Sequence, residues 1–351
     1  MYEKELRFFA DIAAEVNEED GVLPAVLGTW SDPEKPNAES FCIALEDLSV
    51  KYDALNGADG LTWEDACDLM IPVANWHAKY WQDDAFAAKH PWLSGATSEE
   101  RGESCVWFDD WVAMFQSDKQ GFWSKYCAHL LSGPDGDAAW EAVDLSFSGK
   151  GSAKLNMDVA NPGMAETFEL LTGPKGNAIV KAMYTKMATR PRTLIHGDMR
   201  PDNLFRSKEK NVDGKHDYKI VDWQAVAYGP AGVEFCEFLF GALPIESYPR
   251  MDELLGIYWA QLTKQCPAAA ESYSLEMAKE DFAMTSALWT CALSFALTGI
   301  LDTIKQMPEH PFWSIMGPAF QRAQECFKVL NLADVVKKIA DEVAEEGAPP
   351  A

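Results

Sequence analysis

One short stretch constrains the fold of this chain more than any other, because strand-forming runs and closely spaced polar residues coincide there. Three runs rich in strand-forming residues lie near one another: Thr193–His196, Leu204–Arg206 and Tyr218–Asp222. Such runs, bounded by Gly, Pro, Asn and Asp, favour strands, whereas the sequence on both sides has mainly helical periodicity. We therefore predict an α+β chain with a strand-containing insert at 193–224, and we expect the chemistry there.

The polar residues of this insert have a spacing that suits phosphoryl transfer. Asp198 is followed five residues later by Asn203, and Asp222 ends the third run. One carboxylate can orient a hydroxyl group and take its proton, while an amide oxygen and a second carboxylate hold Mg²⁺ on nucleotide phosphates. The simpler interpretation is structural, with Asp198 capping a tight turn. A chance match to HGDxxxxN occurs in about one chain per thousand of this length, so we favour the chemical interpretation.

The balance of charges excludes several classes of protein. The chain has 351 residues, with 30 Lys and Arg against 55 Asp and Glu, and a formal net charge of −25. A chain this acidic repels phosphate backbones and anionic lipid headgroups. We therefore expect neither nucleic acid nor a membrane as a partner, and no obligate protein partner is evident.

The sequence also favours a cytoplasmic location. The N-terminus lacks a basic segment followed by an apolar run and a cleavage site, and the eight cysteines are dispersed in the manner of reduced thiols. The segment Phe282–Leu301 has 20 residues without a charge, which is long enough to span a bilayer. Asp281 and Asp302 flank it, however, and no basic cluster anchors either end. We predict a buried core helix there.

The N-terminal part contains few predicted strands. Residues 2–16 place apolar side chains on one face, which predicts an amphipathic helix followed by an acidic loop. The runs Ala25–Trp30 and Phe41–Leu45 predict an antiparallel strand pair. Thr62 and Asp65 then have the form of a capping box that opens a long helix.

These motifs resemble a known family. HGDMRPDNLF at 196–205, followed by IVDWQ at 220–224, is similar to the catalytic and metal-binding loops of the aminoglycoside phosphotransferase and choline kinase-like family of the protein-kinase-like fold, closest to its ecdysteroid-kinase-like branch. IALEDL at 43–48 resembles that family's hinge between two lobes, and WHA at 76–78 resembles the helix after the hinge. The segment 229–235 resembles the one that follows the metal loop.

The resemblance runs from about Glu5 to at least residue 245, and it implies a protein-kinase-like, two-lobed α+β fold. Residues 1–48 would form a truncated small lobe that ends in the hinge. Residues 49–343 would form a large, mainly helical lobe, and residues 344–351 a disordered tail.

The resemblance also implies roles for the residues of the insert. Asp198 would be the catalytic base, and Asn203 and Asp222 would bind Mg²⁺. His196 would brace the catalytic loop by hydrogen bonding. Arg200 would reach the γ-phosphate of ATP, with a solvated arginine as the alternative.

Other residues correspond to the nucleotide site of the family. The Glu46 carbonyl and the Leu48 amide would face adenine, with Leu45 at its edge. Glu5 corresponds to the helix glutamate that pairs with a strand lysine, yet only four residues precede it. We therefore expect no counterpart of that lysine or of the Gly-rich loop, with Glu5 left without a partner and ATP bound weakly.

The sequence thus predicts an ATP-dependent kinase of a small-molecule hydroxyl group, with ATP and Mg²⁺ as cofactors. The acceptor is left open among amino alcohols, aminoglycosides and sterols. One alternative is a non-catalytic pseudokinase or small-molecule-binding module, because the segments 148–152 and 173–176 do not fit a Gly-rich phosphate loop. A second alternative is an incomplete form of a longer kinase. A metal-dependent hydrolase is less favoured, because it does not account for the hinge-like segment.

Overall fold

The computed structural model of the chain describes residues 2–32, 40–93, 174–289 and 325–346, together with positions 163, 166, 167, 170, 171, 319, 322 and 323. The described part is mixed α+β, with helices and small antiparallel sheets, as the sequence predicts. Its α-helices are α1 (Tyr2–Asp11), α2 (Ala13–Asp20), α3 (Trp63–Lys79), α4 (Asp84–Lys89), α10 (Gly176–Ala188), α11 (Glu234–Leu239), α12 (Met251–Gln265), α13 (Pro267–Ser272) and α16 (Leu332–Glu346). Its strands are β1 (Val26–Ser31), β2 (Phe41–Leu45), β3 (Tyr52–Ala54), β4 (Arg192–Ile195), β5 (Leu204–Lys210), β6 (His216–Ile220) and β7 (Ala227–Pro230). Short 3-10 helices are η1 (Leu48–Val50), η2 (Pro201–Asn203), η3 (Trp223–Ala225), η4 (Ala231–Val233) and η5 (Ile245–Arg250).

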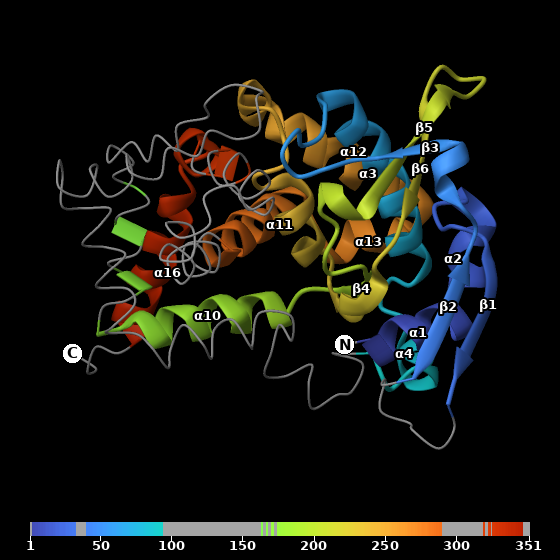
Figure 1. Cartoon of the computed structure of the whole chain (residues 1–351). Coiled ribbons are helices and arrows are strands. Elements are labelled where there is room, and N and C mark those ends of the chain that lie inside the picture. The colour runs from blue at the N-terminus through green and yellow to red at the C-terminus, as the bar shows by residue number, and fades with distance from the viewer. Residues whose placement is uncertain are drawn as a thin grey trace, which may run out of the picture.

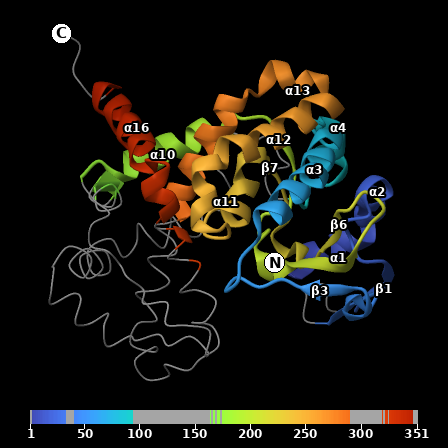
Figure 2. The same ribbon diagram turned by 90° about the horizontal axis from the view of Figure 1, so that it is seen from above.

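The first and last elements lie at opposite ends of the described part. Figures 1 and 2 both place α1, α2 and β1 at one end and α10 with α16 at the other. The strands of the insert and helices α3 and α12 lie between these ends (Figure 1). The predicted division at residue 48 remains a prediction.

The strands form three small antiparallel sheets, in the orders β1-β2, β3-β5-β6 and β4-β7. The predicted strands of the insert are all present, but they do not share one sheet. Strand β4 pairs with β7, where Ile195 lies opposite Ala227, while β5 pairs with β6. Strands β3 and β7 were not predicted, because each is only three or four residues long and is defined by its partner rather than by its own sequence.

The N-terminal helix differs from the prediction in its bounds. The expected single helix over residues 2–16 is divided into α1 and α2, and the expected acidic loop is helical as far as Asp20. The helix ends where Gly21 adopts a left-handed conformation with φ of 59°, and its N–H donates to the Asn17 carbonyl. Glycine reaches this conformation without a Cβ clash, so it is the residue that stops the helix.

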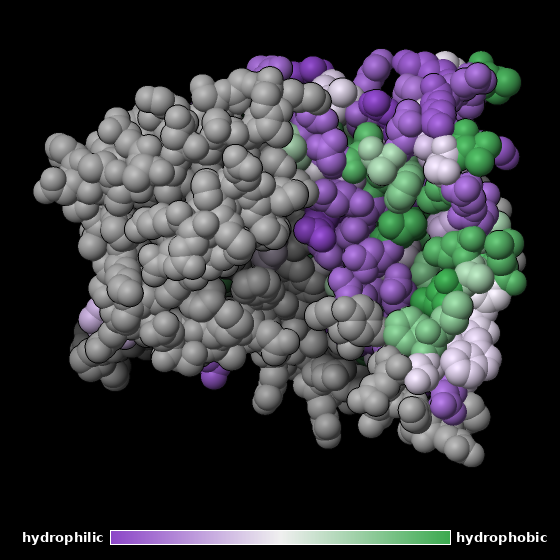
Figure 3. Space-filling view, in the orientation of Figure 1, coloured by the Kyte–Doolittle hydropathy of each residue, from purple (hydrophilic) through white to green (hydrophobic). Residues whose placement is uncertain are grey.

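The predicted β1–β2 pair is confirmed, with Trp30 opposite Cys42. All six residues of β1 are exposed, including Leu27 at 71% and Trp30 at 58%. Figure 3 shows a hydrophobic area over this end of the molecule. The segment leading into β1 is joined to the insert, since the Ile220 amide donates to the Val22 carbonyl at 2.8 Å.

The capping box at the start of α3 is confirmed. The Asp65 amide donates to the Thr62 hydroxyl at 3.1 Å, and the Thr62 amide donates to the Asp65 carboxylate at 3.0 Å. The Asp65 carboxylate also accepts from the Tyr218 hydroxyl at 2.7 Å and from Arg206 at 3.1 Å. The cap therefore ties the start of α3 to the β5–β6 hairpin.

The uncharged segment is helical where the structure describes it. Residues 282–288 are all buried, as predicted for a core helix, while residues 290–301 lie outside the described residues. None of the helices that the structure describes is long and apolar enough to cross a membrane. The predicted tail begins too early, because α16 continues through Glu346, and residues 347–351 lie outside the described residues.

Candidate functional site

The pairing of β5 with β6 brings the two polar loops of the insert together. Leu204 lies opposite Ile220 in this ladder, so the residues just outside the paired positions, Asn203 and Asp222, belong to neighbouring turns. The Val221 amide donates to the Asn203 carbonyl at 3.0 Å. Residues far apart in the sequence thus meet at one place, as the sequence interpretation required.

His196 braces both loops, which confirms its predicted role. Its imidazole is fully buried. Nδ1 accepts from the Asp198 amide at 3.1 Å, while Nε2 lies 2.9 Å from the Val221 carbonyl. These two partners assign the proton to Nε2, because Nδ1 must accept and a carbonyl cannot donate. The ring also packs edge to face on Trp223.

Glu234 binds the backbone of the loop that begins at His196. The sequence did not predict this role. Its carboxylate is buried and accepts from the His196 amide at 2.6 Å and from the Gly197 amide at 3.3 Å. Its Oε2 lies 3.7 Å from Nε2 of His77. The sequence placed Glu234 in a family-like segment but gave no sign of which groups it would bind.

His77 has a structural role. It is fully buried, and its Nδ1 hydrogen-bonds the Tyr258 hydroxyl at 2.8 Å. Burial lowers the pKa of His77 more than the nearby Glu234 raises it. The imidazole is therefore neutral near neutral pH, and it serves as a packed, hydrogen-bonded member of α3.

The two aspartates interact through their charges. Asp222 adopts a left-handed backbone conformation with φ of 64°, which is uncommon for a residue other than Gly. Burial raises the pKa of Asp222, and the charge of Asp198 raises it further, against smaller opposing effects of His196 and Arg200. Arg200 Nε lies 3.5 Å from Oδ1 of Asp198, and its side chain is 44% exposed. The structure therefore places Asp198, Arg200 and Asp222 in one electrostatic environment.

Asn203 is held so that one amide atom is left for a ligand. Its side-chain N–H donates to the Asp198 carbonyl at 2.8 Å, and its own amide donates to the Arg200 carbonyl at 2.9 Å. In the described part of the chain, Oδ1 takes no hydrogen bond. An amide oxygen beside carboxylates is a hard donor set of the kind that Mg²⁺ prefers.

The donor set of one amide oxygen and two carboxylates is compatible with magnesium. No cluster of three or more His, Cys, Asp or Glu side chains suited to a metal occurs among the described residues. Mg²⁺ commonly takes one or two carboxylates and completes its shell with water and phosphate oxygens. A divalent cation would also relieve the repulsion between Asp198 and Asp222.

Glu5 is hydrogen-bonded to the loop that carries Asp222, so the expectation that it lacks a partner is wrong. Its Oε1 accepts from the Trp223 amide at 3.2 Å. Phe8, one helical turn further on, stacks on the Trp223 ring with centroids 4.0 Å apart. Burial raises the pKa of Glu5, and the charge of Asp222 raises it further. Helix α1 therefore contacts Trp223, the residue that follows Asp222.

The predicted adenine-binding residues form a separate group at the end of β2. The Glu46 amide donates to the Ala25 carbonyl, and the Ala25 amide donates to the Glu46 carboxylate, both at 2.9 Å. Leu48 begins η1, where the first amide of a helix has no intrahelical acceptor. Leu45 is half-buried. Among the described residues, no hydrogen bond or ion pair joins this group to the candidate metal site.

A family model described as "Uncharacterized oxidoreductase dhs-27" (DUF1679) matches residues 174–314. The match covers less than half of the chain, and it includes both polar loops and Glu234. No curated protein matches the chain significantly.

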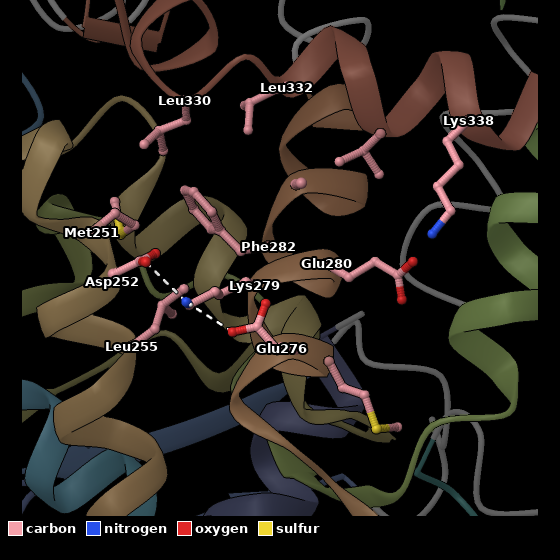
Figure 4. A pocket seen from close by; sticks show the side chains of 13 residues that line it. Met251, Asp252, Leu255, Glu276, Lys279, Glu280, Phe282, Leu330, Leu332 and Lys338 are labelled. Atoms are coloured by element: carbon pink, nitrogen blue, oxygen red, sulfur yellow. Dashed lines mark hydrogen bonds and ion pairs between the residues drawn. The ribbon is translucent and has the colours of Figure 1, made fainter.

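A pocket of about 510 Å³ lies elsewhere, between α12, residues 276–283 and α16. Its walls are mainly apolar, and Lys279 bridges Asp252 and Glu276 at its rim, at 2.8 Å and 3.0 Å (Figure 4). None of the predicted site residues lines it.

Proposed function

We propose that the chain is an ATP-dependent phosphotransferase that acts on a hydroxyl group of a small molecule. The observation that carries this proposal is the meeting of Asp198, Asn203 and Asp222 at one edge of the insert. They are joined there by the hydrogen bonds of His196 and by the Asn203–Val221 contact. Two carboxylates and an amide oxygen in one place are the groups that a magnesium-supported phosphoryl transfer uses.

Asp198 is the proposed base. In a direct, in-line transfer, the acceptor oxygen forms a bond to the γ-phosphorus, the bond from that phosphorus to the bridging oxygen breaks, and ADP leaves. The hydroxyl proton passes to the Asp198 carboxylate. His196 holds the Asp198 main chain through its amide, so the carboxylate is presented from a fixed loop.

Asn203 and Asp222 would hold Mg²⁺, which when bound supplies positive charge next to the phosphate oxygens. Arg200 lies beside Asp198 and is partly exposed, so its guanidinium can contact the γ-phosphate. Glu5 supports the loop of Asp222 through the Trp223 amide. These residues therefore position both the metal and the transferred group.

The segment Leu45–Leu48 would bind adenine. The carbonyl of Glu46 and the first amide of η1 are an acceptor and a donor at the end of β2, as an adenine edge requires. We expect weak nucleotide binding, because Glu5 accepts from the Trp223 amide rather than from a lysine that could hold the phosphates. The division into lobes at residue 48 and a cytoplasmic location belong to the same proposal.

The description of the matching family includes the word oxidoreductase. Dinucleotide-binding oxidoreductases of the Rossmann type use a GxGxxG turn after a strand, and the sequence contains no GxGxxG. The alternative that remains is a binding module that holds a nucleotide without transferring phosphate.

Two measurements test the proposal. The first is calorimetric titration of ATP with and without Mg²⁺. The second is ADP release in the presence of amino alcohols, aminoglycosides or sterols. We expect Asp198→Asn to lose turnover by a factor on the order of 10² to 10⁴ and to retain Mg·ATP binding. Asp222→Asn should lose the magnesium-dependent part of the affinity. Asp213→Asn, on the exposed turn between β5 and β6, is the matched control and should behave as the wild type.

Each result distinguishes the two functions. Magnesium-dependent ATP binding without turnover for any acceptor of the panel would favour the binding module. Unchanged turnover in Asp198→Asn would refute the catalytic base. A wild-type chain that binds no Mg·ATP would refute both.

A further inference from the structure

Arg322 connects its own segment with two others, residues 57–58 and Gly241, next to the candidate site. Its guanidinium is largely buried, and burial lowers its pKa. Nε donates to the Gly241 carbonyl at 2.7 Å, Nη1 donates to the Ala58 carbonyl at 3.0 Å, and Nη2 donates to the Gly57 carbonyl. A buried guanidinium is costly to desolvate unless its donors are satisfied, and three carbonyl dipoles satisfy it here.

Gly57 connects this guanidinium to the catalytic loop. Its carbonyl accepts from Arg322, and its own amide donates to Oδ1 of Asp202 at 3.2 Å. Gly57 is buried and has no side chain. Its carbonyl contacts a cation, and its amide contacts a carboxylate. Each charge faces the end of a peptide dipole that it favours.

The loop around Gly57 is held tightly. Gly60 has φ of 72°, and a Cβ added there would lie 2.3 Å from the Ala242 carbonyl oxygen and 3.2 Å from Cζ of Arg322. The Leu61 amide also donates to the Ala242 carbonyl at 2.8 Å. Little space is left for the loop to shift while Arg322 is in place.

Asp202 immediately precedes Asn203 in η2. The Leu55 amide donates to the Leu204 carbonyl at 2.9 Å, so the loop that carries Gly57 contacts the chain on both sides of Asn203. A displacement of this loop therefore acts on the turn that orients the Asn203 side chain.

We propose that Arg322 is a positioning residue, which fixes the Asp202–Asn203 turn through Gly57. Its functional part rests on the proposed function, because Asn203 is the proposed magnesium ligand. Sequence reasoning had no sign of this link, since Arg322 and Gly57 are separated by 265 positions.

Hydrogen–deuterium exchange with the full chain tests the link without requiring activity. Arg322→Lys keeps the charge but cannot donate to three carbonyls in one plane. We expect exchange on the order of tenfold faster in peptides covering residues 55–61 and 198–204, a change also around Gly241, whose carbonyl loses the Arg322 donor, and no change in the rest of the described chain. Asp202→Ala should accelerate the same peptides, whereas Asp202→Asn retains an acceptor oxygen and should restore wild-type exchange.

Arg7→Lys is the control, because Arg7 is an exposed arginine that pairs with Glu3, and it should leave both peptides unchanged. Unchanged exchange at 198–204 in both Arg322→Lys and Asp202→Ala overturns the proposal, and so does a uniform acceleration throughout the chain. If Arg322→Lys does not fold, Asp202→Ala against Asp202→Asn still decides the question.

Calorimetric titration of Mg·ATP completes the test. We expect Arg322→Lys to weaken the magnesium-dependent affinity on the order of tenfold, as for residues that orient a metal ligand, and to leave magnesium-independent ATP binding unchanged. Equal loss of both affinities contradicts positioning of Asn203. If the wild type binds no Mg·ATP, the proposed function fails, and the exchange measurement still decides whether Arg322 fixes the turn.

Discussion

Two antiparallel strand pairs, β1–β2 and β4–β7, have similar backbone ladders but opposite environments. Every residue of β1 is exposed, whereas every residue of β4 and β7 is buried. Yet half of the residues are apolar in β1 and half in β4, which begins with Arg192 and Thr193. The proportion of apolar residues in a strand therefore does not decide which pair enters the core.

The surroundings explain the difference. The Thr193 hydroxyl donates to the His77 carbonyl at 2.7 Å, and Arg192 donates to the Tyr228 carbonyl at 3.2 Å, so the polar groups of β4 are satisfied inside the protein. Strand β1 has β2 as its one strand partner in the described part of the chain. The loop that carries Asp198 follows β4 directly. The comparison indicates that the backbone of the candidate site is attached to the buried pair β4–β7, where packing can hold it in place.

The largest expected effect on the free energy of unfolding is that of replacing Glu234, which supports the loop after β4. Glu234→Ala leaves the buried amides of His196 and Gly197 without their acceptor, at a cost of about 1–3 kcal/mol for each group. We expect the free energy of unfolding, measured by urea titration, to fall by about 3 kcal/mol or more. Trp30→Ala in the exposed hairpin should change it by less than about 0.5 kcal/mol. Equal losses at the two positions would contradict the distinction between the pairs.

Two glycines provide a matched comparison of space in the two regions. A Cβ at Gly232, just after β7, would lie 2.3 Å from Cβ of the buried Asp281, whereas a Cβ at Gly28 in β1 would meet nothing within 4 Å. We expect Gly232→Ala to destabilise the protein by about 1–3 kcal/mol, as overpacked sites do. Gly28→Ala should be neutral or stabilising by up to about 1 kcal/mol, because the unfolded chain loses freedom. Thermal unfolding measures both, and a destabilised Gly28→Ala would show that β1 is less open than described.

Burial of Asp222 and its repulsion by Asp198 predict that the Asp222→Asn variant is more stable than the wild type at neutral pH. The pKa of Asp222 is raised in the folded protein, so its ionisation costs stability as the pH rises above the ordinary pKa of an aspartate, and the cost is complete above the folded pKa. Asp222→Asn removes this cost and tolerates the left-handed backbone. We expect it to unfold at a higher temperature at pH 7, by no more than about 2 °C for a partly exposed charge, and to equal the wild type at pH 3.

Magnesium provides the control for this prediction. It should stabilise the wild type at pH 7 and leave Asp222→Asn unchanged. A lower unfolding temperature for Asp222→Asn at pH 7 would mean that the carboxylate is stabilised by partners rather than repelled.

Substitutions in the β1–β2 hairpin are expected to have the smallest effect on folding stability. They should, however, have a clear effect on self-association. An uncharged, exposed strand edge is prone to pair with another chain, and β1 carries no charged residue. We expect the wild type to self-associate with rising concentration, and Leu27→Ser with Trp30→Ser to reduce this while stability changes by less than about 0.5 kcal/mol. Light scattering after gel filtration measures it. Val212→Ser, at an isolated and fully exposed apolar residue, is the control, and a wild type that is monomeric at all concentrations contradicts the prediction.

Local signals in the sequence determined a substantial part of this protein. The capping box of Thr62 and Asp65 predicted the start of α3, and runs rich in strand-forming residues predicted β1, β2 and the strands of the insert. The motif around Asp198 identified the candidate site residues that meet in the structure. These features depend on residues within a few positions of one another, so their geometry follows from short-range sterics and hydrogen bonding.

The tertiary structure alone decided what holds that site in place. Glu234 binds the His196 amide over 38 positions, Glu5 binds the Trp223 amide over 218, and Arg322 binds the Gly57 carbonyl over 265. A buried carboxylate or guanidinium bonds whichever backbone group the packed chain presents to it, and backbone groups are identical along the sequence. No local pattern therefore marks these partners, and only the packing of distant segments selects them.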